Sequence, residues 1–428
     1  MDLKDIVAKE LEAARQRSLT LVAPIPDEDL VRQHSPLMSP LVWDVAHVGN
    51  YEEIWLLRTI AGVPAHAPQL DDIYDAFKHA RRERTRLKLL GPAESRTYIS
   101  DVRGKAFEVL ESVEFDPANP LLNEGYVYGM VIQHEHQHDE TMLATLQLRK
   151  DEYPISAEPP PNGGVIETKE VLVTGGPFVM GTDTEPWAYD NERPANVVDL
   201  PAFWIDTAPV SNRAFIEFIE AGGYSDRRWW SEEGWQHRTD EGIEHPEFWR
   251  RHGTGWSRYR FGREEALPLD EPVQHVCWYE AEAYARWAGK RLPTEPEWEK
   301  AASWDIATGT KRRYPWGDLS PTPEHANLGQ RYFRPAPVGA YPAGVSPWGC
   351  HQMIGDVWEW TASNFDRHPG YTCFPYREYS EVFFGRDYKV LRGGSWATHP
   401  IAIRNTFRNW DFPIRRQIFC GFRCARDA

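Results

Sequence analysis

The sequence has no apolar run long enough to cross a membrane, so no membrane-spanning helix is expected. It also has no surplus of basic residues. The formal net charge of −16 argues against a nucleic-acid or anionic-membrane partner, because such partners need a basic surface. Cysteine is scarce, and five irregularly spaced cysteines favour a reducing cytoplasm over a disulfide framework. The mixed-charge start of the chain is not typical of a signal peptide. We therefore expect a cytoplasmic protein, and no obligate protein partner is evident.

The 428 residues divide into two halves of different texture. Residues 1–150 show apolar residues at helical spacing, which predicts an up-and-down helical bundle. The expected helices cover residues 3–21, 41–60, 70 into the arginine-rich stretch after it, 95–113 and 123–149. Residues 151–168 are rich in proline and glycine and predict a linker.

Residues 169–428 contain short apolar runs, many turns and nearly all of the 19 tryptophans. Strands are expected at 170–173 and 178–181, and helices at 210–221 and 279–288. Thr294 and Glu297 have the spacing of a capping box that opens a further helix. The prediction is an α+β protein of two domains, the second with little regular structure.

The helix expected at 123–149 places three of the 15 histidines within five residues. His134 and His138 share a helix face because they are four residues apart, so the pair can bind one metal ion. His136 points the other way, and Gln137 lies beside the shared face. The alternative is a polar helix whose histidines face solvent.

A third ligand must come from elsewhere, and His47 on the helix expected at 41–60 is the candidate. Metal sites in bundles are built from facing helices, although a buried histidine can also be a structural core residue. Asp44, one turn earlier, is placed to hold a histidine or to be a surface charge. Three histidines suit Zn²⁺, whereas non-haem iron more often takes two histidines and a carboxylate. The spacing leaves both metals open.

Two groups of motifs resemble known families. Residues 37–47 and 134–141 are similar to the DinB-like bundle of the sulfoxide synthases of ergothioneine biosynthesis. The remainder resembles the formylglycine-generating-enzyme (FGE-sulfatase) domain, which is related to C-type lectin folds. Its landmarks lie at 175–178, 291–295, 355–360, 392–396 and 421–423. The resemblance implies a DinB-like domain at 1–150, a linker at 151–168 and an FGE-sulfatase domain at 169–428.

The resemblance also implies an activity. These synthases are O₂-dependent, mononuclear non-haem Fe(II) enzymes that join the sulfur of γ-glutamylcysteine to the imidazole of hercynine and oxidise the sulfur to a sulfoxide. His47, His134 and His138 would bind Fe(II) and leave open positions for substrates and O₂. Neutral ligands preserve the positive charge on the metal, which favours thiolate binding.

Further site residues follow from the same resemblance. Tyr376 would be the catalytic proton or hydrogen-atom donor, because a phenol stays protonated at neutral pH. An active site between the two domains is expected, since this loop belongs to the second and the histidines to the first. Asn409 and Trp410 would face the trimethylammonium end of hercynine, and Gln137 and Tyr379 would be further substrate contacts. For the thiol substrate, Asp411 would pair with the amine, and the carboxylates would be bound by Arg415, Arg81 and Arg84.

Other interpretations remain open on the sequence. A homologue that uses free cysteine, or an ovothiol-type enzyme that attacks the other imidazole carbon, would share most of these residues. A DinB-type zinc thiol-transferase would leave the second domain without a chemical role, and a lectin-like binding module would leave the histidines unexplained. Formylglycine-generating enzymes bind copper through a cysteine pair, but residues 401–408 contain no cysteine, which predicts that this copper chemistry is lost.

Overall fold

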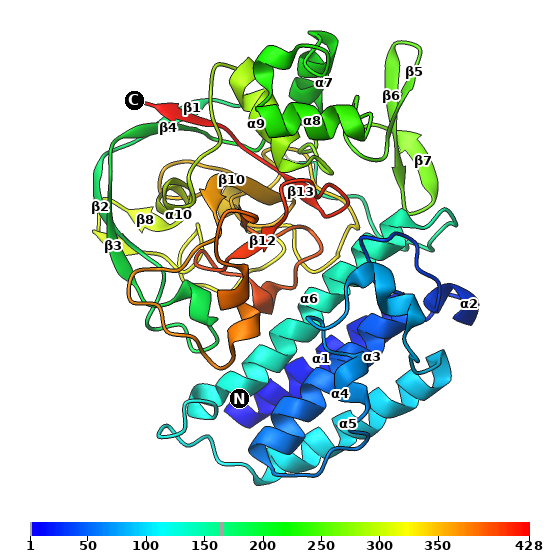
Figure 1. Cartoon of the computed structure of the whole chain (residues 1–428). Coiled ribbons are helices and arrows are strands. Elements are labelled where there is room, and N and C mark those ends of the chain that lie inside the picture. Colours follow the sequence, from blue (N-terminus) through cyan, green and yellow to red (C-terminus); the bar gives the residue numbers. More distant parts are fainter. Residues whose placement is uncertain (1, 163, 165) are drawn as a thin grey trace. The chain divides into compact units, whose positions relative to one another are not determined.

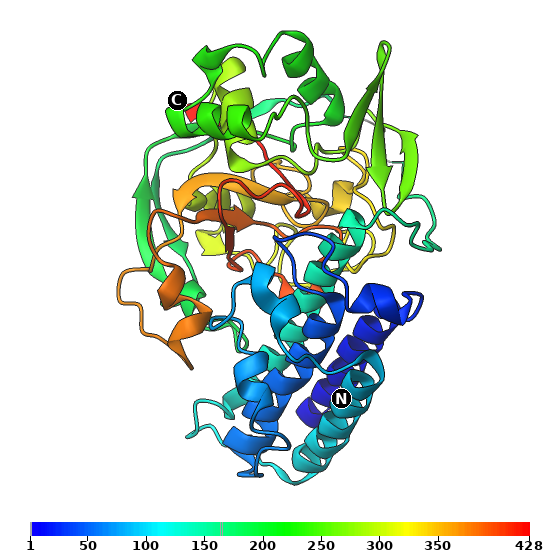
Figure 2. The same ribbon diagram turned by 45° about the vertical axis from the view of Figure 1, so that its right-hand side comes forward.

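The computed structural model describes residues 2–162, 164 and 166–428. The chain forms two compact units, whose elements are shown in Figures 1 and 2. The first comprises Met1–Pro154 with Thr184–Trp187, and the second comprises Ile155–Asp183 with Ala188–Ala428. The first is helical and the second combines short strands with helices, so the expected two-domain α+β fold is confirmed.

The first unit is a bundle of long helices, coloured blue to cyan in Figure 1. Helix α3 packs against α5 and α6, and α1 packs against α6. Val7, Leu11 and Ala14 on α1 are fully buried at helical spacing, which is why this segment folds as an amphipathic helix. The α-helices of this unit are α1 (Leu3–Val22), α2 (Asp27–Leu30), α3 (Leu41–Glu52), α4 (Leu70–Ile73), α5 (Pro92–Ser112) and α6 (Tyr126–Leu148). A π-helical segment, η1 (Glu53–Ile60), continues α3, and a 3₁₀ turn, η3 (Asn123–Gly125), precedes α6.

The prediction of one continuous helix from residue 70 into the arginine-rich stretch is wrong. The segment after residue 70 is not a continuous helix: α4 ends at Ile73, and the arginine-rich stretch forms a separate 3₁₀ helix, η2 (Arg81–Arg86). Between them the Asp75 carboxylate accepts hydrogen bonds from the backbone N–H groups of Phe77 and Lys78. Such local side-chain bonds compete with the helical hydrogen-bond ladder and end it.

Residues Thr184–Trp187, expected within the second domain, belong by their contacts to the first unit. The Trp187 indole donates to the Glu124 carbonyl at 3.1 Å, and Gln133 donates to the Trp187 carbonyl at 3.0 Å. Gly129 allows this packing, because a Cβ there would lie 2.2 Å from the Trp187 ring.

Four buried charges tie the long helices together, one from each of α1, α3, α5 and α6. Arg15 contacts Glu52 and Glu135, each at 2.7 Å. Arg103 contacts the same two carboxylates at 2.6 and 2.8 Å. No side chain of the four is more than 5% exposed. Burial opposes ionisation of Glu135, but the two arginines hold its pKa well below its ordinary value.

The second unit is built from small sheets and separate helices. Its four-stranded sheet has the order β12-β11-β10-β13, and a three-stranded sheet has the order β1-β4-β14. The remaining sheets are β2-β3, β5-β6-β7 and β8-β9. The strands are β1 (Glu170–Val173), β2 (Gly176–Met180), β3 (Asn196–Leu200), β4 (Phe203–Asp206), β5 (Trp249–His252), β6 (Gly255–Arg260), β7 (Arg263–Ala266), β8 (Trp304–Asp305), β9 (Thr310–Lys311), β10 (Trp358–Asn364), β11 (Lys389–Arg392), β12 (Asn409–Asp411), β13 (Cys420–Gly421) and β14 (Ala425–Asp427).

The helices of this unit match most of the expectations. They are α7 (Asn212–Glu220), α8 (Glu232–Asp240), α9 (Trp278–Trp287) and α10 (Glu295–Ser303). The capping box is confirmed, since the Thr294 N–H donates to Glu297 at 2.7 Å and Glu297 N–H donates to the Thr294 hydroxyl at 3.4 Å. Helix α8 was not expected, because its mostly polar residues show no apolar stripe. A core cluster includes Phe203 and Ile205 from β4 and Trp298 from α10.

Within the part of the chain that the structure describes, no helix has the length and apolar character needed to cross a bilayer.

We predict that Glu52→Ala lowers the free energy of unfolding by about 3–5 kcal/mol, because it leaves Arg15 and Arg103 buried with half their counter-charge. Urea unfolding followed by helical circular dichroism measures the loss. The control is Glu12→Ala on the exposed face of α1, which should change stability by less than about 0.5 kcal/mol. Similar losses in both variants would contradict the role of the buried charges.

Candidate active site

The three predicted metal ligands meet inside the first unit. His47 comes from α3, and His134 and His138 come from α6, where their four-residue spacing places them on one face. One nitrogen from each ring lies within 4.8 Å of the other two. The Nε2 atoms of His47 and His134 are 3.2 Å apart. Among the described residues this is the group of histidines, cysteines and carboxylates whose geometry suits a bound metal.

The opposite nitrogens of two rings are held by acceptors. His47 Nδ1 lies 2.8 Å from the Tyr74 carbonyl oxygen, and His138 Nδ1 lies 2.9 Å from Asp44 Oδ1. An acceptor at Nδ1 selects the tautomer that donates there and leaves the Nε2 lone pair free. The free lone pairs therefore point into the cluster, which is the arrangement that a metal ion requires.

Aromatic rings fix the orientation of the ligands. Trp43 stacks on His47 with ring centroids 4.5 Å apart, and Tyr51 stacks on His134 at 3.7 Å. Trp43 and Tyr51 lie one turn on either side of His47 on α3, so one helix supplies a ligand and a ring against each of two histidines. A ligand whose ring cannot rotate loses little conformational entropy when a metal binds.

The protonation state of the cluster suits metal binding. Burial, followed by the nearby His138, lowers the pKa of both His47 and His134 well below the ordinary histidine value. Both rings are therefore neutral at neutral pH, and neutral imidazole is the form that coordinates a metal. Few protons compete with the metal for these nitrogens.

His136 lies away from the cluster, as expected, but it does not face solvent. It is 2% exposed, and its Nδ1 lies 3.2 Å from Asp139 Oδ2 in the bundle interior. Burial lowers the pKa of His136 to about 3, so the ring is neutral. The alternative of a helix whose histidines face water is therefore wrong for His134 and His136. Gln137 is half-buried beside the ligand face, where the sequence placed it.

The two arginines predicted to bind substrate carboxylates differ in their surroundings. Arg84 is 4% exposed and donates to Ser39 Oγ at 2.7 Å and to the Ala76 carbonyl at 3.0 Å. Its guanidinium also lies 3.6 Å from the ring centre of Trp43. Burial, with Arg81 next in effect, lowers the pKa of Arg84 to about 10. Arg81 is more accessible and donates to the Leu37 carbonyl at 3.2 Å.

The predicted residues of the second unit form a cluster of their own. The Tyr379 ring lies 6.3 Å from that of Tyr376 and 5.9 Å from that of Trp410. Trp410 stacks on Phe365 at 4.0 Å. The structure thus brings Tyr376, Tyr379 and Trp410 together, with Asn409 adjoining Trp410 on β12.

Asp411 and Arg415 form an ion pair, with Arg415 Nε 3.1 Å from Asp411 Oδ1. The pair presents one charge of each sign at the end of β12. An amino-acid moiety also carries both charges, so this pair can match an ammonium and a carboxylate together.

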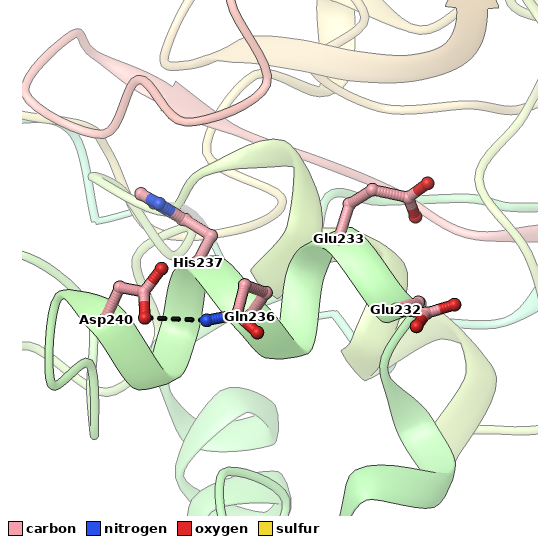
Figure 3. A pocket seen from close by; sticks show the side chains of 5 residues that line it. All are labelled: Glu232, Glu233, Gln236, His237 and Asp240. Carbon is pink, nitrogen blue, oxygen red and sulfur yellow. Dashed lines mark hydrogen bonds between the residues drawn. The ribbon is translucent and has the colours of Figure 1, made fainter.

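A surface depression on α8 does not belong to this site. It is lined by Glu232, Glu233, Gln236, His237 and Asp240, and Gln236 donates to Asp240 at 2.7 Å (Figure 3). None of the predicted site residues lines it. Its carboxylates lie on an open helix face, where water solvates them.

Sequence reasoning missed several contacts of the cluster. Tyr51 lies four residues after His47, so its position on the ligand face was available from helical spacing. The Tyr74 acceptor is a backbone carbonyl, which no residue type encodes. Asp44 was weighed against a surface charge, and the structure shows that it is 1% exposed and holds His138.

Comparison with known proteins agrees with both units. Residues 10–142 match the DinB superfamily, and residues 156–428 match the sulfatase-modifying factor enzyme 1-like domain. The chain is 52% identical to the hercynine oxygenase of Mycolicibacterium smegmatis, with all of both chains covered. It is 53% identical to that of Mycolicibacterium thermoresistibile, over 98% of this chain and 94% of the relative. The formylglycine-generating enzyme of Bos taurus is 33% identical over 61% of this chain and 75% of its own.

We predict that His134→Ala lowers metal affinity by orders of magnitude, because it removes one of three converging ligands. Metal content after anaerobic reconstitution and desalting measures the loss. The control is His136→Ala on the same helix, which should keep full metal content although its buried contact with Asp139 is lost and stability falls. Full metal content in His134→Ala would show that the cluster is not the metal site.

Proposed function

The chain belongs to the hercynine oxygenase family, and we propose that it uses Fe(II) to join hercynine to γ-glutamylcysteine. The enzyme is thus an oxygenase of hercynine. The proposed reaction consumes one O₂: the thiol and the imidazole C–H each lose hydrogen, one oxygen atom enters the sulfoxide, and the other leaves as water. The observation that carries the proposal is the convergence of His47, His134 and His138, of which His47 and His134 are buried and neutral.

The residues present fit an iron ion. Three imidazole nitrogens would leave further positions on the ion open, and the Asp44 carboxylate holds His138 rather than occupying such a position. Fe(II) bound there would supply O₂ activation and a site for the thiolate. The protein's own contribution is to fix the ring orientations through Tyr74, Asp44, Trp43 and Tyr51.

We assign the proton or hydrogen-atom donor to Tyr376. Two outcomes compete when a thiolate and O₂ meet: the thiol takes up both oxygen atoms and becomes a sulfinic acid, or sulfur couples to the imidazole. A phenol held close to the reacting atoms delivers the hydrogen that favours coupling. Tyr376 is half-buried and directly precedes η7 (Arg377–Tyr379), in a loop of the second unit.

The substrate contacts follow from charge and shape. A quaternary ammonium donates no hydrogen bond, so the ring faces of Trp410 and Tyr379 with the amide oxygens of Asn409 and Gln137 suit hercynine. We assign the Asp411–Arg415 pair and Arg81 to the amine and carboxylates of γ-glutamylcysteine. Free cysteine has one amine and one carboxylate, so it would leave one of the two arginines without a partner. The three charged residues therefore favour γ-glutamylcysteine, which has a second carboxylate.

The contacts of Arg84 support a different role from that of Arg81. Its guanidinium already has Ser39, Ala76 and Trp43 as internal partners. We propose that Arg84 holds η2 against α3 and thereby positions Arg81, whose side chain is the more accessible of the two.

Product analysis tests the proposed function. The protein is purified anaerobically, loaded with Fe(II) or Zn(II), and given O₂, hercynine and either γ-glutamylcysteine or cysteine. We expect O₂ uptake and a sulfoxide conjugate by mass spectrometry only with Fe(II), and preferentially with γ-glutamylcysteine. Conjugate formed equally with Zn(II) would contradict the iron assignment, and a preference for cysteine would overturn the choice of thiol.

We predict that Arg81→Ala raises KM for γ-glutamylcysteine by about 10- to 150-fold, the loss expected for a charge-assisted contact of about 1.5–3 kcal/mol. KM for hercynine should change little. Arg84→Ala should instead lower thermal stability, because Arg84 packs inside the unit. The matched control is Arg82→Ala, an exposed neighbour on η2. Equal effects of Arg81→Ala on both substrates would indicate a general structural role.

We predict that Tyr376→Phe keeps its metal and binds both substrates but diverts the product to the sulfinic acid of the thiol. The change removes one hydroxyl and leaves the aromatic packing with Tyr379. Mass spectrometry of both products measures the ratio. A wild-type sulfoxide yield in this variant would remove Tyr376 from the mechanism.

A further inference from the structure

The loop that carries Tyr376 has little regular structure of its own. It joins β10 to β11 and contains two single-turn 3₁₀ helices, η7 and η8 (Glu381–Phe383). A catalytic side chain on such a loop needs support from elsewhere, because a misplacement of about 1 Å is enough to cost much of the rate. The contacts of this loop identify where the support lies.

One buried carboxylate binds the loop on both sides of Tyr376. Asp190, 2% exposed, accepts a hydrogen bond at Oδ2 from the Tyr371 hydroxyl at 2.6 Å and from the Phe374 N–H at 3.3 Å. Its other oxygen, Oδ1, accepts from the Ser380 hydroxyl. Two of these donors precede Tyr376 and one follows it, so Asp190 spans the base of the loop.

The residues on either side of Asp190 reinforce the same contact. The Tyr189 ring stacks on Tyr379 with centroids 4.0 Å apart and planes 18° from parallel. Asn191 donates from its amide to Ser380 Oγ at 3.0 Å. Ser380 itself is fully buried, so it is held by two side chains of one short segment.

That segment, η4 (Asp190–Glu192), is anchored in turn to the chain that leads into β12. Arg404 Nε donates to Glu192 at 2.8 Å, and the Thr406 hydroxyl donates to Glu192 at 2.6 Å. Arg408 donates to the Asn191 carbonyl at 2.8 Å. Residues 404–408 run directly into Asn409 and Trp410. One anchor therefore fixes the tyrosine loop relative to the proposed substrate strand.

We propose that Asp190 is a positioning residue that holds Tyr376 in the place from which it directs the reaction to C–S coupling. This rests on the role proposed for Tyr376. A carboxylate suits the position because it accepts from all three donors, whereas an asparagine would present an N–H₂ group to one of them. Weakening the anchor leaves Tyr376 less often in place, and the thiol is then oxidised to the sulfinic acid before coupling.

The test is the ratio of sulfinic acid to sulfoxide in Asp190→Asn, measured on the full-length Fe(II)-loaded enzyme. We expect the ratio to rise severalfold with unchanged iron content. The matched control is Asp206→Asn, a buried aspartate of the same unit that pairs with Lys290. It should keep the wild-type ratio, which separates loop positioning from general destabilisation.

Single-donor variants keep the test decisive if Asp190→Asn does not fold. Tyr371→Phe and Ser380→Ala each remove one hydrogen bond to Asp190, and each should raise the ratio in the same direction. A folded Asp190→Asn, or both single-donor variants, with the wild-type ratio would overturn the proposal.

The Tyr376→Phe variant separates this inference from the proposed function. If Tyr376→Phe shifts the ratio and the anchor variants do not, the positioning role alone fails. If Tyr376→Phe itself has the wild-type ratio, the role of Tyr376 and the positioning role both fail. In the double variant Asp190→Asn with Tyr376→Phe, we expect no shift beyond that of Tyr376→Phe alone.

Discussion

The buried charge group of Arg15, Arg103, Glu52 and Glu135 is the interaction on which the metal cluster depends. Glu52 lies on the same helix as His47, and Glu135 directly follows His134. Two carboxylates bridged by two arginines can be satisfied in one register of the four helices, and any slip would leave a buried charge unpaired. Desolvation offsets much of the attraction, so the group contributes specificity of alignment more than net stability. The alignment brings histidines from α3 and α6 within bonding reach of one ion.

Each unit uses a buried carboxylate to hold a chemically active side chain. In the first, Asp44 fixes His138 by one hydrogen bond. In the second, Asp190 gathers three donors around the loop of Tyr376. An ionised carboxylate only accepts hydrogen bonds, so both suit positions that face donors, and Asp190 uses both of its oxygens for donors on the two sides of Tyr376. The reactive residues themselves are ordinary histidine and tyrosine, and it is the supporting contacts that give them a defined position.

The sequence predicted what depends on local spacing or on a recognisable motif. The pair His134 and His138 and the capping box at Thr294 are periodic or short-range features, and the structure contains both. The continuous helix expected after residue 70 does not form, because the Asp75 side chain accepts a hydrogen bond from a backbone N–H that a helix would use. The family resemblance implied a substrate contact for Arg84, and its internal partners could not be predicted because they are set by tertiary packing. Asp190 and Ser380 lie far apart in the chain, so no local pattern connects them.

The central claim is that His47, His134 and His138 hold one iron ion. A crystal structure of the anaerobically Fe(II)-loaded protein, with anomalous diffraction collected on both sides of the iron absorption edge, tests it most directly. We expect one anomalous peak that appears above the iron edge and lies at coordination distance from the Nε2 atoms of all three histidines. An iron peak at another position would contradict this claim. So would protein isolated without added metal whose anomalous signal at the three histidines does not change across the iron edge but rises at the zinc edge.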